Sequence, residues 1–353
     1  MHPALDTPLT KLLGCRYPII QTAMGWVSRP ELVAASCNAG AFGFLAAASL
    51  RADEVGPAIA RIRELSDRPF GVNFHLFQPG AAQIVDTLIA ERVRAVSFGR
   101  GPDKAAIKRF RDAGIICIPT VGAVRHAQKM VEIGVDALTI QGGEGGGHTG
   151  SVPTTILLPQ VLDAVRVPVV AAGGFRDGRG LAAALAYGAA GIAMGTRFLM
   201  TRDCPIPETT KQRYLAAGLD DITLTTRLDG LPHRLIRNEV LARIERSGRL
   251  RMLLTAGANA LRLKRLTGAS LGDMLRAARG VQAEGGLTFA QALMAANSPS
   301  LIQRSMIAGR PDQGVMSAGV VAGVLQDLPS CAELIERIVH EAEERLAALA
   351  PGG

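Results

Sequence analysis

The chain has 353 residues, of which 48% are hydrophobic, 20% charged and only 4% aromatic. This length suits one large domain or two smaller ones, and the apolar content is sufficient for a sizeable core. The low aromatic content argues against a protein that stacks nucleic-acid bases. The formal net charge of +8 favours acidic small molecules such as phosphates.

Cysteine usage and hydropathy indicate a cytoplasmic protein. The five cysteines are widely spaced and form no CxxC pair, so we expect buried free thiols, with neither a disulfide framework nor a metal site. Residues 1–6 lack the charged and apolar regions of a signal peptide. The uncharged residues 32–50 approach membrane-spanning length, but Asn38, Gly40 and Gly43 interrupt them.

Short apolar runs recur at intervals of about 20–30 residues and predict strands. They are residues 19–24, 41–46, 70–74, 94–98, 115–120, 137–140, 167–172 and 190–194. Helical patterns alternate with them at residues 29–38, 55–65, 82–91, 104–112, 124–133, 156–164 and 180–187. Glycine helix stops precede several strands, at Gly40, Gly114, Gly134 and Gly188.

Eight such units predict an α/β fold, a (β/α)8 TIM barrel. A doubly wound open sheet is the alternative. No G-x-G-x-x-G follows the first strand, whereas glycine-rich segments follow strands six, seven and eight. Barrel enzymes commonly build phosphate sites from the loops after the last two strands.

The pattern changes after the eighth strand. Residues 208–300 show helical periodicity without a clear strand run, and residues 234–265 contain nine Arg or Lys but only two Glu. We expect an inserted helical lid there, and an amphipathic helix at residues 331–350. The expected organisation is a barrel over residues 1–205, a helical lid and substrate subdomain over 206–315, and C-terminal helices closing the barrel over 316–353.

Residues 141–150 hold six glycines and His148 directly after the sixth predicted strand. Glycines let backbone N–H groups approach a ligand closely, and a histidine held there can exchange protons with it. A flexible linker with a surface histidine is the structural alternative.

Two further strand ends carry glycines. Gly173 and Gly174 follow strand seven beside a helix expected to start near Gly180, and Gly195 follows strand eight. Amide groups at such turns bind anions, so we predict one shared phosphate site rather than two tight turns. Met24 could lie against a flat ring or in the core, and Asn73 could bind a heterocycle or make a local bond.

With these segments in view, the chain resembles the nitronate monooxygenase (2-nitropropane dioxygenase-like) family of FMN-dependent barrel enzymes. The resemblance rests on residues 18–26, 69–73, 134–150, 168–175, 193–198 and 317–323. It implies that His148 is the active-site proton acceptor. It also implies an FMN site formed by Ala23, Met24, Gly25, Asn73, Gln141, Gly143, Gly147, Ala172, Gly173, Gly174, Met194, Gly195 and Thr196.

One subgroup of this family is a closer match, the flavoproteins that act on CoA thioesters in bacterial steroid C- and D-ring degradation. Residues 142–155, 175–203, 213–233 and 292–297 resemble it, and residues 225–234 are the most distinctive. Arg227, His233 and Arg234 are then expected to bind substrate, since CoA carries several phosphate charges. A solvated basic face is the structural alternative.

The expected function is FMN-dependent redox chemistry on such a thioester, with NAD(P) as an electron partner. The alternatives are oxidation of alkyl nitronates with O2, a flavin-dependent enoyl-thioester reductase, and a phosphate-binding barrel without catalysis. The quinone-reductase branch carries a lysine after strand five, where residues 118–121 here read Ile-Pro-Thr-Val. We expect no nucleic-acid or membrane partner, and a homodimer formed through the C-terminal helices.

Overall fold

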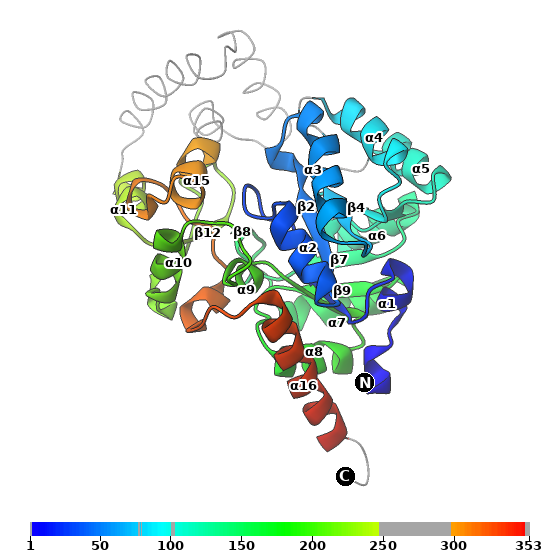
Figure 1. Cartoon of the computed structure of the whole chain (residues 1–353). Coiled ribbons are helices and arrows are strands. Elements are labelled where there is room, and N and C mark those ends of the chain that lie inside the picture. The colour runs from blue at the N-terminus through cyan, green and yellow to red at the C-terminus, as the bar shows by residue number, and fades with distance from the viewer. Residues whose placement is uncertain (1, 77, 79, 100–102, 247–297, 350–353) are drawn as a thin grey trace. The chain divides into compact units, whose positions relative to one another are not determined.

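The computed structural model describes residues 2–76, 78, 80–99, 103–246 and 298–349 (Figure 1). Internal contacts divide the chain into two units. The barrel unit comprises Met1–Gly145, Thr149–Pro205 and Leu325–Gly353, and the second unit comprises Gly146–His148 and Ile206–Val324. The three-part organisation expected from the sequence stays a prediction.

The barrel unit is built on nine parallel strands in the order β5-β4-β3-β2-β1-β10-β9-β7-β6. Their bounds are β1 Ile19–Gln21, β2 Phe42–Ala46, β3 Gly71–Asn73, β4 Ala95–Ser97, β5 Ile116–Cys117, β6 Thr120–Val121, β7 Leu138–Gln141, β9 Val169–Ala172 and β10 Gly191–Met194. All eight predicted strands are confirmed, since β5 and β6 are two halves of the predicted run 115–120. The ladder breaks there because Pro119 has no N–H to donate.

The break between β5 and β6 is also where the sheet closes. The Ile118 N–H donates to the Val96 carbonyl at 2.9 Å, and the Pro119 carbonyl accepts from the Thr139 N–H at 2.9 Å. One stretch of chain therefore bonds to both ends of the strand order. This closure excludes the doubly wound open sheet and confirms the (β/α)8 barrel.

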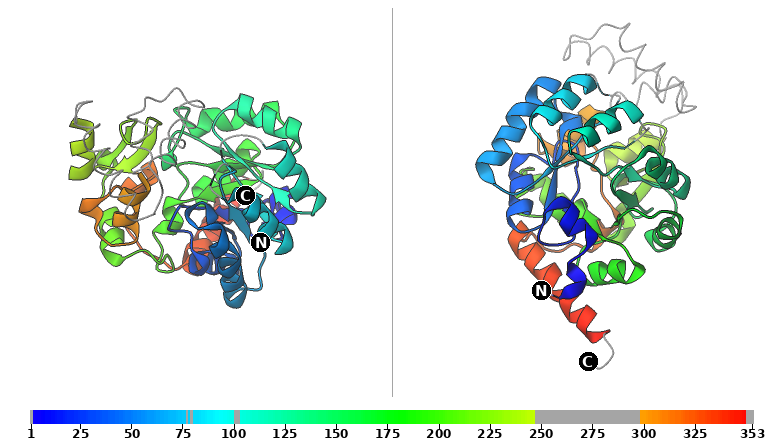
Figure 2. Two further views of the ribbon diagram at one scale, coloured as in Figure 1. Left: turned by 90° about the horizontal axis from the view of Figure 1, so that it is seen from above. Right: turned by 90° about the vertical axis from the view of Figure 1, so that its right-hand side faces the viewer.

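Helices alternate with the strands and surround them (Figure 2). They are α1 Pro8–Leu13, α2 Pro30–Asn38, α3 Ala52–Leu65, α4 Ala81–Ala90, α5 Lys104–Asp112, α6 Val124–Ile133, α7 Thr154–Ala164, α8 Gly178–Tyr187, α9 Thr196–Leu199 and α16 Cys331–Ala348, with 3-10 turns at Pro3–Leu5 and Ala47–Ser49. The predicted helices are confirmed with shifted ends. Gly134 and Gly188 stop α6 and α8 at φ of 97° and 99°, the left-handed region that glycine adopts without strain. In the described ranges no helix has the length and apolar character needed to cross a bilayer.

The second unit contains a small antiparallel sheet in the order β11-β12-β8. Its elements are β8 Gly147–His148, β11 Ile222–Thr225, β12 His233–Ile236, α10 Glu208–Leu215, α11 Glu239–Arg246 and α15 Ser298–Met306, with 3-10 turns at Leu219–Asp221, Pro311–Gln313 and Val320–Val324. Residues 208–300 were expected to be mostly helical without a clear strand run, and the structure adds the strands β11 and β12 to the helices there. β11 and β12 are short and half polar, so their apolar periodicity is weak. Residues 247–297, with most of the basic run, lie outside the described residues.

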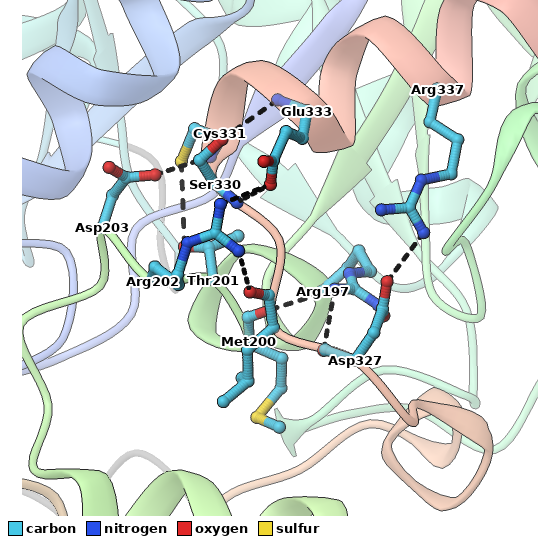
Figure 3. A network of polar contacts seen from close by, with 11 residues as sticks. Arg197, Met200, Thr201, Arg202, Asp203, Asp327, Ser330, Cys331, Glu333 and Arg337 are labelled. Atoms are coloured by element: carbon cyan, nitrogen blue, oxygen red, sulfur yellow. Dashed lines mark hydrogen bonds and ion pairs between the residues drawn. The ribbon is translucent and has the colours of Figure 1, made fainter.

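The C-terminal segment is attached to α9 by a polar network (Figure 3). Arg197, with 4% of its side chain exposed, binds Asp327 Oδ1 at 2.7 Å and the Met200 carbonyl at 3.0 Å. Asp327 also binds Arg337 at 2.7 Å, and Asp203 accepts from the Cys331 N–H at 2.6 Å. α16 begins within this network and packs on α8 and α2.

Asp327→Asn should lower the free energy of unfolding near neutral pH by about 1–3 kcal/mol, because a buried guanidinium loses its charged acceptor. Burial acts to raise the pKa of Asp327, but the hydrogen bonds from Arg337 and Arg197 outweigh it and lower that pKa below 3.8. The stabilisation is therefore present above pH 3.8 and is lost as pH falls below it.

Chemical denaturation of wild type and variant at several pH values measures this difference. It should shrink on acidification, and a constant difference down to pH 3 would contradict the ion-pair origin. Asp112→Asn is the control, because it removes only the exposed ion pair with Lys108 and should change stability by less than about 1 kcal/mol.

Candidate active site

The residues predicted to contact a flavin in the barrel unit lie at the carboxyl ends of its strands. Gln141 aligns with Ala172 at the ends of β7 and β9, and Met194 aligns with the last residue of β1. Asn73 ends β3. Because all these strands are parallel, their ends meet at one rim, which carries the active site in (β/α)8 enzymes.

The turns after β1 and β10 approach each other at this rim. Met24 closes the first turn, where its carbonyl accepts from Val27 and Ser28. Ala23 and Met24 are half-buried and Gly25 is exposed. A Cβ on Gly195 would lie 3.0 Å from the Thr22 hydroxyl and 3.4 Å from the Met24 sulfur, so the two turns run close together.

Asn73 makes a local hydrogen bond, which was the alternative to binding a heterocycle. Its amide nitrogen donates to the Ser97 carbonyl at 3.1 Å and to the Ser97 hydroxyl at 3.3 Å. This fixes the amide between the ends of β3 and β4. Both roles are compatible, because a side chain held in this way is preoriented for a ligand at the rim.

The glycines after β9 fit an anion. Gly173 and Gly174 adopt φ of 106° and 83°, which side chains with a Cβ rarely reach. Neither amide N–H donates to an acceptor in the described part of the chain. The neighbouring strand β10 ends beside this turn, and Gly195 and Thr196 connect β10 to α9. These features are compatible with a phosphate group, whose oxygens accept from backbone amides.

The amide groups at the start of α8, which were expected to assist this anion site, already have acceptors within the protein. α8 begins at Gly178 rather than near Gly180, and Asp177 accepts from the Gly180 N–H at 3.2 Å. The Glu341 carboxylate of α16 accepts from the Gly178 N–H at 2.9 Å. A phosphate there would meet two negative charges, so the anion site depends on the two glycine turns alone.

The glycine-rich segment after β7 is held firmly, so the flexible-linker alternative does not hold. The Gly143 N–H donates to the Val152 carbonyl at 2.7 Å. The Glu144 carboxylate accepts from the Thr154 amide at 2.9 Å and its hydroxyl at 2.7 Å. A Cβ on Gly142 would overlap the Thr154 hydroxyl. The glycines are therefore required by close backbone approach.

His148 lies in the second unit, within a cluster that the sequence pattern did not reveal. β8 pairs with β12 so that His148 faces His233, with ring centroids 4.6 Å apart. His148 Nε2 lies 2.6 Å from Asp229 Oδ2, and His233 Nδ1 lies 3.8 Å from the same oxygen. The His148 side chain is 44% exposed, whereas those of Asp229 and His233 are 6% and 4% exposed.

Asp229 is a buried carboxylate that stays ionised. Burial is the largest influence and raises its pKa, but the His148 hydrogen bond, the neighbouring His233 ring and the His148 charge outweigh it, so the pKa lies well below the usual range. An ionised carboxylate at hydrogen-bond distance favours a proton on His148 Nε2. The Nδ1 atom is then the one able to accept a proton.

His233 is anchored on its other side. Its Nε2 lies 2.8 Å from the Ser317 hydroxyl, and the Ser317 carbonyl accepts from the Tyr214 hydroxyl at 2.6 Å. His233 was predicted to bind substrate, but its burial suits support of Asp229. Of the other predicted substrate residues, Arg227 is exposed, and Arg234 is half-buried in β12 opposite Gly147.

The cysteines are not candidates for a nucleophile. Cys37, Cys117, Cys204 and Cys331 are buried and free, and Cys15 is half-buried, which confirms the expected free thiols. Burial raises the pKa of Cys15, Cys37 and Cys117 to about 12. These three therefore remain protonated thiols at neutral pH and do not react as thiolates.

A TIM barrel with glycine turns after its last two strands, together with a histidine–carboxylate pair in the second unit, fits the class of flavin oxidoreductases. Residues 6–88 and 81–341 match the sequence profile of the nitronate monooxygenase family. The chain belongs to this family, whose members are flavin oxidoreductases.

Two similar curated relatives carry the same name, (3aS,4S,5R,7aS)-5-hydroxy-7a-methyl-1-oxo-octahydro-1H-indene-4-carboxyl-CoA dehydrogenase. The Mycobacterium tuberculosis protein is 49% identical over 341 residues and covers 96% of each chain. The Rhodococcus jostii protein is 47% identical over 345 residues and covers 98% of each. The solved structure of FabK from Thermotoga maritima matches with a TM-score of 0.80, 29% identity and 98% coverage of both chains.

Gly142→Ala should lower the free energy of unfolding by about 1–3 kcal/mol, because its methyl group would overlap the Thr154 hydroxyl and force the loop apart. Thermal and chemical denaturation measure the loss. Gly99→Ala is the matched control, since a Cβ there meets nothing within 4 Å. Equal stability of the two variants would show that the loop is not held as described.

Proposed function

We propose that this protein is an FMN-dependent dehydrogenase that oxidises a ring alcohol of a CoA thioester formed in steroid breakdown. The observation that carries the proposal is the His148–Asp229 pair, whose histidine lies in the glycine-rich segment that follows β7. The names of the two 47–49% identical relatives support the substrate class, since both describe a 5-hydroxy-indene-4-carboxyl-CoA.

The reaction removes a hydride and a proton from the secondary alcohol and leaves a ketone. A bound flavin supplies the two-electron acceptor for the hydride. His148 Nδ1 accepts the hydroxyl proton, which converts the imidazole into an imidazolium. Asp229 holds the ring in the accepting tautomer and stabilises the positive charge that forms, because its carboxylate lies 2.6 Å from Nε2.

FMN is proposed as the flavin because the glycine turns after β9 and β10 suit a terminal phosphate. Gly173, Gly174, Gly195 and Thr196 would hold that phosphate, and Met24 and Asn73 would line the ring system. Gln141 and Gly143 would lie along the same ligand. NAD(P) as the electron partner, the homodimer and the cytoplasmic location remain predictions.

A nitronate monooxygenase is the second candidate, and the family match favours it. There the same histidine atom would accept a proton from the carbon of a nitro compound. The two functions differ in the need for CoA. A thioester dehydrogenase requires cations for the CoA phosphates, and we propose Arg227 on the exposed β11–β12 turn and the half-buried Arg234 in β12 for this role.

The deciding experiment is a visible spectrum of the purified protein, followed by anaerobic addition of a β-hydroxyacyl-CoA. Flavin bands that bleach with the thioester support the dehydrogenase. Bands that respond to a nitronate alone favour the monooxygenase, and bands that respond to NAD(P)H with an enoyl thioester favour a reductase. Protein that stays colourless after added FMN indicates a phosphate-binding barrel and would overturn the proposal.

His148→Ala should slow flavin reduction by the thioester by roughly 100-fold or more, the usual contribution of a positioned general base. Asp229→Asn should reduce the rate less, with KM unchanged, because it disturbs the tautomer but leaves the ring in place. Stopped-flow absorbance measures both. His126→Ala, on an exposed helical position, is the control. A loss below about threefold in His148→Ala with flavin still bound would contradict its role.

Arg227→Gln should raise KM for the CoA thioester several-fold with kcat nearly unchanged, because a phosphate contact binds ground and transition state alike. The effect should diminish at high ionic strength, where the charge is screened. Steady-state kinetics across a salt series measures it. Arg246→Gln, an exposed cation on α11, is the comparison variant. If both variants behave alike, the arginine belongs to a solvated face.

A further inference from the structure

The second unit brings His148 together with Asp229, 81 residues further along the chain, and with His233. Each of these three residues offers one ligand atom, and the three atoms lie within 4.8 Å of one another. We infer that this cluster binds a single divalent transition-metal ion such as Zn²⁺, and that the bound ion inhibits the enzyme. The inhibitory part rests on the proposed function, whereas binding itself does not.

The donor set determines which metal suits the site. Two imidazoles and one carboxylate favour Zn²⁺ or Co²⁺, whereas Mg²⁺ and Ca²⁺ prefer oxygen ligands alone. His148 is partly exposed, while the other two ligands are buried. Solvent therefore reaches one side of the cluster, which leaves a coordination position for water, as in zinc sites with three protein ligands.

The distances are close to those of a metal site. Metal–ligand bonds of about 2.0–2.2 Å place tetrahedral ligand atoms roughly 3.3 Å apart. The Asp229 oxygen lies 2.6 Å from His148 and 3.8 Å from His233. Moving from the hydrogen-bonded arrangement to a coordinated one requires the exposed His148 ring to shift by less than the length of a bond.

The groups behind the ligands are also in place. Ligating histidines usually use their second ring nitrogen for a hydrogen bond, which fixes the tautomer. His233 does so through Ser317 at 2.8 Å, while its Nδ1 faces Asp229 Oδ2 at 3.8 Å. Asp229 is held by the Leu231 N–H on its other oxygen at 3.2 Å. Pairing of β8 with β12 fixes the two histidines opposite each other.

Inhibition follows from the tautomer. A metal on His148 Nε2 displaces the proton that this atom donates to Asp229. The neutral ring then carries its proton on Nδ1, the atom that must accept the proton of the substrate hydroxyl. The same ion also draws the Asp229 charge away from the imidazolium. A metal-loaded cluster therefore cannot act as the proton acceptor, and a chelator should restore it.

Metal binding is tested on the purified holoenzyme after dialysis against EDTA and then chelator-free buffer. Zn²⁺ is titrated against a chromophoric chelator, and Co²⁺ is titrated separately to read its tetrahedral absorption at longer wavelengths than the flavin bands. One Zn²⁺ per chain is expected. Asp229→Asn, His233→Gln and His148→Gln should each weaken binding at least tenfold, since each removes a direct ligand.

His126→Gln and His340→Gln are the matched controls, because both histidines are exposed and lie on helices of the barrel unit. Flavin content and thermal unfolding confirm that each variant is folded, and any one of the three ligand variants suffices if another fails to fold. Absence of saturable binding, or equal affinity in ligand and control variants, would overturn the inference.

The inhibitory part has its own readout. Stoichiometric Zn²⁺ should abolish flavin bleaching by the thioester, and EDTA should restore it fully. If the metal-free enzyme does not bleach with the thioester, the proposed function fails, but the titration still decides the metal site. If it bleaches equally with bound Zn²⁺, the inhibitory inference fails while the proposed function stands.

Discussion

The closed parallel sheet is the constraint on which the rest of the structure depends. Closure occurs where residues 116–121 bond to β4 on one side and β7 on the other. Since every strand runs in the same direction, the carboxyl ends of β1, β3, β7, β9 and β10 meet at one rim. Met24, Asn73 and Gly173 are far apart in the chain and share that rim only because the ring is closed.

Close backbone approach explains the unusual glycine content of the rim. Gly142 and Gly173 both lie against the Thr154 hydroxyl. The ends of β7 and β9 and the start of α7 therefore pack so closely that a Cβ at either glycine would meet this hydroxyl. Glu144 satisfies the first amide of α7 from the same loop. The glycines thus serve two purposes, because they permit the packing and leave amides for an anion.

The chemistry of the second unit depends on one buried charge. Asp229 remains ionised because His148 hydrogen-bonds to it and His233 lies beside it, even though burial alone would favour the neutral acid. That charge sets the proton position on His148, and the same charge makes the cluster a competent metal ligand set. A residue that supports proton transfer and attracts a divalent cation makes the enzyme sensitive to the metal content of its surroundings.

The sequence by itself determined the repeating units. The periods of apolar runs and the glycine helix stops specified all eight strand positions. Buried strands require apolar residues, and helix ends with a left-handed backbone favour glycine. It also marked the two glycine turns and His148. Only the tertiary structure decided the partners of that histidine. Asp229 lies 81 residues away, and its role arises from the pairing of β8 with β12.

β11 and β12 were not predictable from periodicity for a related reason. Their alternation is short, and a strand of four residues of which two are polar leaves almost no hydrophobic signal. The sequence also did not predict that Asp177 and Glu341 accept hydrogen bonds from the first amides of α8. Glu341 lies on α16, 163 residues beyond Gly178. Local sequence encodes elements and their ends, whereas long-range packing selects which charges meet.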